Sequence, residues 1–130
     1  MDSQAQIKGM LDQKVWAVVG ATDNEDKFGH KIYKMLKKAG YRVFPINPGL
    51  QTVMGDECYP SLTALPEKPD AVNFVVPPKV GEKIVAECAV LGIKNIWLQP
   101  GANSDNVVNA AKKADLNVIC QSCILVEARK

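Results

Sequence analysis

Residues 15–22 read VWAVVGAT, and residues 29–32, which read GHKI, follow after a short polar stretch. Five consecutive apolar residues, Val15–Val19, are typical of a strand that helices cover on both faces. Gly20 ends this run, and apolar residues at helical spacing begin at Ile32. In open parallel α/β sheets, such a strand–turn–helix unit presents free backbone N–H groups and a helix N-terminus to phosphate-bearing ligands. The stretch therefore predicts an α/β fold with a phosphate-binding turn.

The rest of the chain repeats this alternation of strand and helix. Apolar residues at i, i+3, i+4 and i+7 predict helices between the strands, one ending at Gly40, one running from Pro77-Pro78 to Gly92, and one carrying Val107 to Ala114. Strand and helix in alternation favour a three-layer, Rossmann-like, doubly wound parallel sheet. The five long strands are predicted at residues 15–19, 41–47, 70–76, 95–99 and 117–120.

The predicted strand order is 3-2-1-4-5-6, with a stunted third strand. That strand is expected as a brief edge strand near residues 57–59, followed by a single helical turn at 61–65. Pro45 lies inside the second strand and cannot donate to a ladder, so pairing must be broken there or one-sided.

A chain of 130 residues is long enough for one domain, and we expect residues 1–130 to form it. Residues 1–13 are expected to contain a short amphipathic helix on the domain edge, because Ile7, Met10 and Leu11 have helical spacing. The core is expected to span residues 15–127, with a short tail.

Composition excludes several classes of protein. The 16 basic and 14 acidic residues leave a formal charge of +2, too small for a nucleic-acid footprint. Lys34, Lys37 and Lys38 fit a solvated helix face. No apolar run approaches the roughly 20 residues of a membrane span, and the first residues lack the features of a signal peptide. Four cysteines are too few for a disulfide scaffold. We therefore expect a cytoplasmic protein with reduced thiols and no membrane partner.

The predicted strand ends share small or rigid turns. They read GAT at 20–22, NPG at 47–49, VPP at 76–78 and QPG at 99–101. Such turns suit a flat ring and a pyrophosphate. The dinucleotide motif G-x-G-x-x-G is absent, because Thr22 stands where its second glycine belongs. Asn47 stands where a carboxylate would hold the ribose of NAD, so a nicotinamide cofactor becomes the weaker option.

Several motifs in order resemble those of the small single-domain CoA-binding proteins. They are GAT at 20–22, VFPINP at 43–48, YPSL at 59–62, Asp70, VVPP at 75–78, LGIK at 91–94, WLQ at 97–99, and Cys123 before Glu127. The resemblance runs from about Val15 to Glu127. The chain is also similar, more distantly, to the N-terminal domain of the succinyl-CoA synthetase alpha subunit.

The resemblance implies that CoA or an acyl-CoA lies across the strand ends. Its phosphates would lie near the first turn and the start of the next helix, with Lys27 as a phosphate contact, and the other strand ends would flank the rest of the ligand. The implied binding residues are Gly20, Ala21, Thr22, Lys27, Phe28, Gly29, Asn47, Pro48, Val75, Val76, Pro77, Pro78, Leu98 and Gln99.

Three acidic residues, Asp23, Glu25 and Asp26, crowd the loop that should receive an anion. Like charges repel phosphate, whereas acidic side chains are favourable just before a helix N-terminus. Two interpretations stay open. Either these side chains cap the helix and face solvent, or the loop has lost its affinity for CoA.

No catalytic or metal-binding set emerges from the sequence. Cys120 and Cys123 form one C-x-x-C motif, weak support for a zinc or redox site, although Cys123 is a candidate to face the cleft. Cys58 and Cys88 fit partly buried thiols. His30 is expected as an exposed first-turn residue, with a ligand contact as the alternative.

The sequence therefore favours a non-catalytic CoA-binding module that serves as a carrier, sensor or regulator. The alternatives are a nicotinamide-dependent oxidoreductase, a nucleotide-sensing regulator and a subunit that supplies the CoA site of an acyl-CoA ligase. A protein partner or a homo-oligomer stays open.

Overall fold

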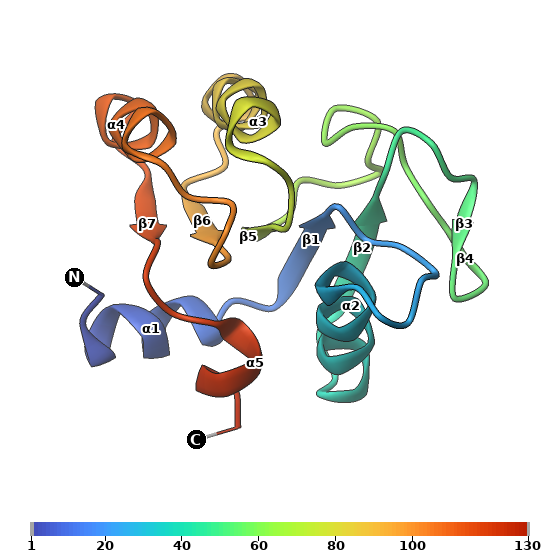
Figure 1. Cartoon of the computed structure of the whole chain (residues 1–130). Helices are drawn as coiled ribbons and strands as arrows, with labels where there is room; N and C mark the ends of the chain where they lie inside the picture. The colour runs from blue at the N-terminus through green and yellow to red at the C-terminus, as the bar shows by residue number, and fades with distance from the viewer. Residues whose placement is uncertain (1, 130) are drawn as a thin grey trace.

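The computed structural model describes residues 2–129 of the chain, and its centre is a parallel five-stranded sheet (Figure 1). The sheet order is β2-β1-β5-β6-β7, so β2 lies on one side of β1, whereas β5, β6 and β7 follow on its other side. The order reverses between β1 and β5, which makes their carboxyl ends the point where ligands bind in such sheets. The Rossmann-like prediction is confirmed. The strands are β1 (Val15–Val19), β2 (Arg42–Ile46), β5 (Ala71–Phe74), β6 (Asn95–Leu98) and β7 (Asn117–Ile119).

The predicted third strand is present only as a single bridge between two residues. Tyr59 forms one parallel bridge with Ile46 on the outer edge of β2, which agrees with the order 3-2-1-4-5-6. Residues 57–59 do not form an edge strand, because the chain folds back first. Met54 and Gly55 have positive φ angles of 51° and 79°, and they turn β3 (Thr52–Val53) into the antiparallel β4 (Asp56–Glu57). In residues 61–65, Ala64 N donates to the Ser61 carbonyl and Leu65 N donates to the Leu62 carbonyl. Two successive i→i+3 bonds make one turn of 3₁₀ geometry, in agreement with the predicted helical turn.

Pro45 pairs on one side only, as its chemistry requires. The carbonyl of Pro45 accepts from Tyr59 N, and the N–H of Asn47, directly after β2, donates to the Tyr59 carbonyl, so these alternate residues direct their backbone outward. The N–H that Pro45 lacks would therefore point away from β1. Its position opposite Val18 breaks no bond of the central ladder.

Helices cover both faces of the sheet (Figure 1), with α3 and α4 on one face and α1, α2 and α5 on the other. Local sequence sets several of their ends. The hydroxyl of Ser3 accepts from Gln6 N at the start of α1, and the hydroxyl of Ser104 does the same for Val107 N at α4. Gly92 ends α3 with a φ of +76°. The helices are α1 (Gln4–Leu11), α2 (Phe28–Lys38), α3 (Pro78–Leu91), α4 (Asp105–Lys113) and α5 (Ile124–Glu127).

Helix α5 was not predicted, because its four residues are too few for a helical period to show in the sequence. Its first residue, Ile124, is fully buried in the cluster that also contains Trp16 and Trp97. This short helix, which lies within the expected core range 15–127, therefore contributes to the core.

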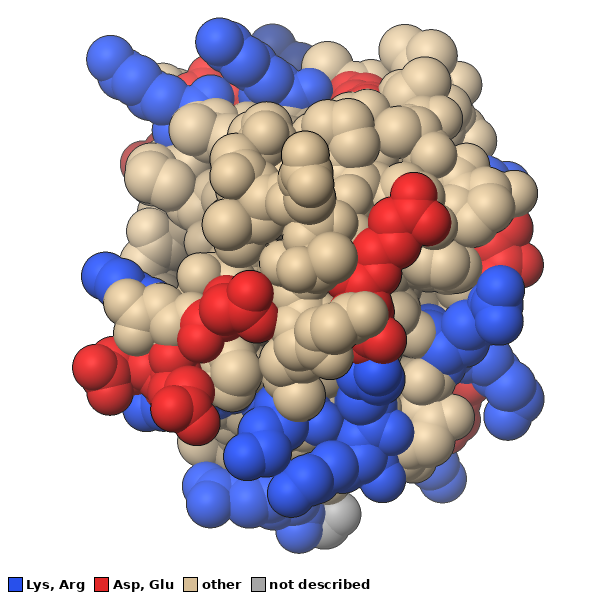
Figure 2. Space-filling model, turned by 90° about the vertical axis from the view of Figure 1, so that its right-hand side faces the viewer, with Lys and Arg blue, Asp and Glu red and all other residues tan. Residues whose placement is uncertain are grey.

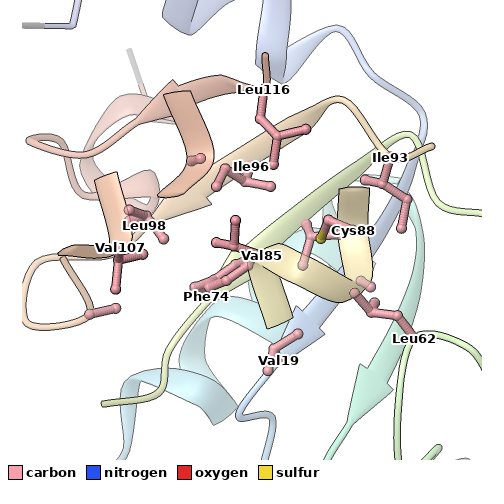
Figure 3. Close-up of a cluster of buried hydrophobic side chains, with 14 of the residues drawn as sticks. Val19, Leu62, Phe74, Val85, Cys88, Ile93, Ile96, Leu98, Val107 and Leu116 are labelled. Carbon is pink, nitrogen blue, oxygen red and sulfur yellow. The ribbon is translucent and has the colours of Figure 1, made fainter. Parts of the chain in front are cut away.

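Two hydrophobic clusters sandwich the sheet. Figure 3 shows the one beneath α3 and α4, where Phe74, Val85, Ile96 and Leu98 point toward one another. Residues of one strand alternate between the clusters, so that Val18 belongs to the α2 side and Val19 to the α3 side. This double burial explains why the strands read as continuous apolar runs.

Charged side chains are unevenly spread over one face of the molecule. In Figure 2, Lys and Arg side chains cover the lower end of the view and also project at its upper left edge, whereas the middle of its upper half is largely uncharged. Lys34 and Lys38, near the C-terminal end of α2, are exposed, in agreement with a solvated helix face. No helix within residues 2–129 combines the length and the apolar content that crossing a membrane requires.

Candidate functional site

Two glycines bring the end of β1 against the start of α2. Gly20 has a φ of +100°, and a Cβ on it would lie 2.3 Å from the carbonyl oxygen of Val75. A Cβ on Gly29 would lie 2.0 Å from the carbonyl oxygen of Gly20. These two residues supply the tight turn and the close helix–strand approach that glycines supply in dinucleotide-binding turns, although the spacing of that motif is absent.

The carbonyl groups of the turn are bound within the protein. The side-chain amide of Asn47 donates from Nδ2 to the Ala21 carbonyl at 3.0 Å, and its Oδ1 accepts from Gly49 N at 2.9 Å. The ring nitrogen Nδ1 of His30 lies 3.0 Å from the Thr22 carbonyl. Because a carbonyl oxygen only accepts, Nδ1 is the protonated nitrogen in this contact. The oxygen atoms of the Ala21 and Thr22 carbonyl groups therefore point toward Asn47 and His30, and not into the space beyond the strand ends.

His30 is only 8% exposed, so the expectation of an exposed first-turn residue was wrong. The reason is its contact with Thr22, which draws the ring beneath the turn. His30 therefore positions the loop that precedes α2.

The acidic residues do not cap α2. Lys27 is the N-cap residue, makes no side-chain capping bond and is exposed, and the first turn of α2 contains no acidic residue. Asp23 instead accepts from Met54 N at 2.7 Å, which ties it to the β3–β4 hairpin. The amides of Phe28 and Gly29 lie in the first turn, where no intrahelical acceptor is available. The helix N-terminus is thus left to a ligand or to solvent.

A first cavity of about 380 Å³ lies between the ends of β1 and β2 and helix α3. Its walls are mostly apolar, with a proline on each of two loops. Of its two charged residues, Glu87 accepts from the backbone N and the hydroxyl of Thr63, at 3.0 and 2.7 Å. The lining residues are Val19, Gly20, Ile46, Asn47, Pro48, Pro60, Ser61, Leu62, Val76, Val80, Lys83, Ile84 and Glu87.

A second cavity of about 320 Å³ lies beyond the ends of β5 and β6. Val76 lines both cavities, so they adjoin at this residue. The remaining lining residues of the second cavity are Val75, Pro77, Pro78, Gln99, Pro100, Gly101 and Ala102.

The binding residues inferred from the sequence divide among three places. Gly20, Asn47, Pro48 and Val76 line the first cavity, and Val75, Val76, Pro77, Pro78 and Gln99 line the second. Ala21, Thr22, Lys27, Phe28 and Gly29 form the adjoining turn and helix start.

Leu98 lies apart from the cavities, because it is fully buried in the core beneath α3 and α4. Phe28 is 55% exposed, with the Lys31 ammonium 5.5 Å from its ring centroid.

Sequence reasoning missed the contribution of α3 to the first cavity. Val80 and Ile84 belong to the apolar stripe of this helix, yet Val80 is 44% exposed and both line the cavity. A signal was available: their i, i+4 spacing begins directly after Pro77-Pro78, next to the reversal of strand order.

All four cysteines are free thiols. Cys58 and Cys88 are buried, more completely than expected, and burial raises the pKa of Cys88 to about 12. Cys120 and Cys123 are half-buried. Residues 2–129 contain no group of three or more His, Cys, Asp or Glu side chains placed to hold a metal ion.

A doubly wound sheet with a glycine turn at the reversal point and adjoining cavities at the strand ends defines a Rossmann-like class of domain. The chain belongs to the CoA-binding domain family, whose sequence model matches residues 14–129. The resemblance stated from the sequence motifs is confirmed.

Relatives of two kinds share this domain. An ADP-forming acetate–CoA ligase I of Archaeoglobus fulgidus is 31% identical over 121 residues, which are 85% of this chain and 18% of the ligase. The uncharacterized protein YneT of Bacillus subtilis is 29% identical over 125 residues, 95% of this chain and 93% of YneT. This chain therefore spans less than a fifth of the ligase and nearly all of YneT.

A solved structure has the same fold. A hypothetical protein from Pyrococcus horikoshii superposes with a TM-score of 0.93 at 28% identity, covering 98% of this chain and 91% of that one.

Proposed function

We propose that this chain binds CoA or an acyl-CoA in an extended form across the carboxyl ends of β1, β2, β5 and β6. The nucleotide end occupies the first cavity, and the pantetheine arm passes Val76 into the second. The observation that carries the proposal is the junction of the two cavities at Val76. A ligand that contacts both must be long and narrow, with a flat apolar end, as CoA is.

The turn after β1 supports a position for the phosphates. The carbonyls of Ala21 and Thr22 are occupied by Asn47 and His30, and the amides of Phe28 and Gly29 at the start of α2 lack intrahelical acceptors. An anion at this position meets N–H dipoles and the positive end of a helix. Lys27, exposed at the N-cap, adds a full positive charge beside them.

The family and the relatives support CoA over other nucleotides. Asn47 is committed to two backbone groups, so neither a carboxylate nor a free amide oxygen is offered to the ribose of NAD. In the proposed role the chain is a cytoplasmic, non-catalytic module that carries or senses CoA. The binding residues we propose are those of the two cavities and of the turn, without Leu98.

Calorimetry with CoA, NAD and ATP tests the proposal, together with native mass spectrometry of the purified protein. We expect CoA to bind most tightly and a mass matching CoA or an acyl-CoA to be retained. Tight binding of NAD with no response to CoA would overturn the proposal.

A pair of variants on one helix tests the first cavity. Val80→Trp places a large ring in the cavity, whereas Val90→Trp places the same ring at a position on α3 that is 86% exposed and outside both cavities. Val80→Trp should weaken CoA binding by about tenfold or more, or about 1.4 kcal/mol. Val90→Trp should leave it unchanged, and equal affinities would place the nucleotide elsewhere.

A second candidate function rests on the ligase relative, of which this chain matches only 18%. In that role the chain supplies the CoA site to an acyl-CoA ligase assembled with other chains. The test is ATP formation from acetyl-CoA, ADP and phosphate. We expect none from this chain alone, and turnover by the purified chain would refute the non-catalytic role.

A further inference from the structure

A polar cluster lies at the inner wall of the second cavity. Gln99 lines this cavity and is only 3% exposed. Its side chain contacts Asn73, which is fully buried on β5, and the thiol of Cys123 at the start of α5. Gln99 belongs to the lining of the cavity proposed to hold the pantetheine arm, whereas Asn73 and Cys123 contact it from outside that lining and have no part in the function proposed above.

The orientation of the Gln99 amide follows from its partners. The backbone N–H of Ile124 donates to Oε1 at 2.9 Å, and only an oxygen can accept that proton. The Nε2 group must therefore face Cys123, and it donates to Sγ at 3.4 Å. A donor aimed at sulfur stabilises the thiolate, which is the reactive form of cysteine.

The loop that holds Cys123 is fixed on both sides. The carboxylate of Asp2 accepts from the backbone N of Cys120 and Gln121, at 3.1 and 2.8 Å, and from the hydroxyl of Ser122 at 2.9 Å. The indole N–H of Trp97 donates to the Ser122 carbonyl at 2.8 Å. Cys123 is thus held beside Gln99 by bonds to its immediate neighbours.

The cluster also retains an open acceptor. Among residues 2–129, Oδ1 of Asn73 is buried and has no hydrogen-bond partner, although its Nδ2 lies 3.5 Å from Gln99 Oε1. Orphaned buried acceptors are rare, because each costs about 1–3 kcal/mol. The cluster behind Gln99 thus lacks one hydrogen-bond donor, and pantetheine, which we propose for the adjoining cavity, carries N–H groups.

Cys123 is distinguished from the other three thiols. Cys58 and Cys88 are buried, and burial raises the pKa of both. Burial and the nearby Asp2 carboxylate raise the pKa of Cys120. Cys123 is half-buried and has the Gln99 donor.

We propose that Cys123 is a thiol–disulfide exchange site for CoA, an inference that rests on the proposed binding of CoA. The Cys123 thiolate attacks one sulfur of CoA disulfide. A Cys123–S–S–CoA bond forms as the original disulfide bond breaks, and the second CoA leaves as a thiolate that takes up the proton lost from Cys123. No further oxidant is required, because CoA disulfide supplies the oxidised sulfur.

The experiment follows adduct formation by intact-mass spectrometry and peptide mapping. Cys120→Ser is the reference protein, because the variant cannot close a disulfide within the C-x-x-C motif. With CoA disulfide we expect one CoA adduct on Cys123, formed about tenfold faster than the adduct with glutathione disulfide, since binding raises the effective concentration. Cys120→Ser/Cys123→Ser should form no adduct.

Two further variants separate recognition from thiol chemistry. Gln99→Leu should slow both reactions by about two- to tenfold, because it removes the donor to the thiolate. Val80→Trp should abolish the preference for CoA disulfide while the reaction with glutathione disulfide continues. Equal rates for the two disulfides in the reference protein would overturn the inference.

Calorimetry with CoA on the same reference protein distinguishes the two proposals. If CoA binds but no adduct forms on Cys123, the exchange site is refuted and CoA binding stands. If CoA does not bind, both proposals fail. A thermal unfolding midpoint for Cys120→Ser/Cys123→Ser that matches the reference protein's shows that a lost adduct reflects the missing thiol and not a lost fold.

Discussion

Gly29 lies so close to Gly20 that the first turn of α2 touches the end of β1. A Cβ on Gly29 would lie 2.0 Å from the carbonyl oxygen of Gly20 and 3.3 Å from the Cα of Ala21. Both are backbone atoms, which cannot move away as the end of a flexible side chain can. The contact sets the distance between the strand end and the helix N-terminus, the two elements to which we assign phosphate binding.

Gly29→Ala should therefore destabilise the protein and weaken its binding of CoA. Overpacking against backbone atoms costs about 1–3 kcal/mol, and we expect the upper part of that range. Urea unfolding measures the loss of stability. The matched control is Gly9→Ala in α1, where a new Cβ meets no atom within 4 Å. That change should stabilise the protein by about 0.5–1 kcal/mol, because alanine is the better helix former. A neutral Gly29→Ala would contradict the close approach.

Lys27→Glu should weaken CoA binding and flatten its dependence on salt. Lys27 is the exposed N-cap residue of α2, so the change removes a positive charge from the proposed phosphate position and adds a negative one. Calorimetry between about 50 and 500 mM salt measures both effects, since the screening length falls across this range. Lys94→Glu is the control, because Lys94 is exposed and lies at the opposite, amino end of β6. Similar affinities for the two variants would remove Lys27 from the site.

The periodic elements could be predicted from sequence because each buries a face. Val15–Val19 is buried on both sides of the sheet, and the stripe of α2 reaches a core containing Ile32 and Leu36, so the apolar pattern carries their structure. Each strand of the β3–β4 hairpin has two residues, and α5 has four. Segments this short show no period, and tertiary contacts such as the burial of Ile124 determine them.

The sequence predicted only those parts of the candidate site that backbone turns form. The turns at Gly20, Asn47 and Pro77 follow from strand ends, which the sequence marks with glycine and proline. The environment of His30 depends on a contact with Thr22 across the loop, and the role of Val80 depends on how α3 lies over the strand ends. Neither relationship has a signature in local spacing. Leu98 lies in the core and its immediate neighbour Gln99 lines the second cavity, because successive strand residues face opposite sides of the sheet.

Asn47→Asp should destabilise the turn by about 1–2 kcal/mol. The amide of Asn47 donates to the Ala21 carbonyl and accepts from Gly49 N, and a carboxylate can do only the second. The new negative charge also faces a carbonyl oxygen 3.0 Å away. CoA affinity should fall, because the freed Ala21 carbonyl can turn toward the phosphates. NAD titration of the same variant checks the alternative: a gain in NAD affinity would show that a carboxylate at this position reaches a ribose.

Acid should weaken the attachment of the β3–β4 hairpin to α2. The Lys37 ammonium and the Tyr33 hydroxyl, the latter at 2.6 Å, both donate to Asp56, and these bonds hold the pKa of its carboxyl below the ordinary value. A lowered pKa means that the stabilisation is complete above the ordinary value of about 3.9 and is lost as the pH falls through the lower, folded-state value. Asp56→Asn should therefore cost about 1 kcal/mol near pH 6, a modest figure because the pair is partly exposed, and progressively less below about pH 4.

Urea unfolding of the protein and of Asp56→Asn across this pH range measures the difference. Tyr33→Phe is the companion variant, because it keeps the buried ring and removes one donor to Asp56. It should raise the pH at which the wild-type stabilisation is lost, since the carboxylate then has Lys37 as its remaining side-chain partner in the described structure. A difference between the protein and Asp56→Asn that stays constant down to about pH 2 would mean that Asp56 titrates alike in the folded and unfolded chains, and that the hairpin is held by packing.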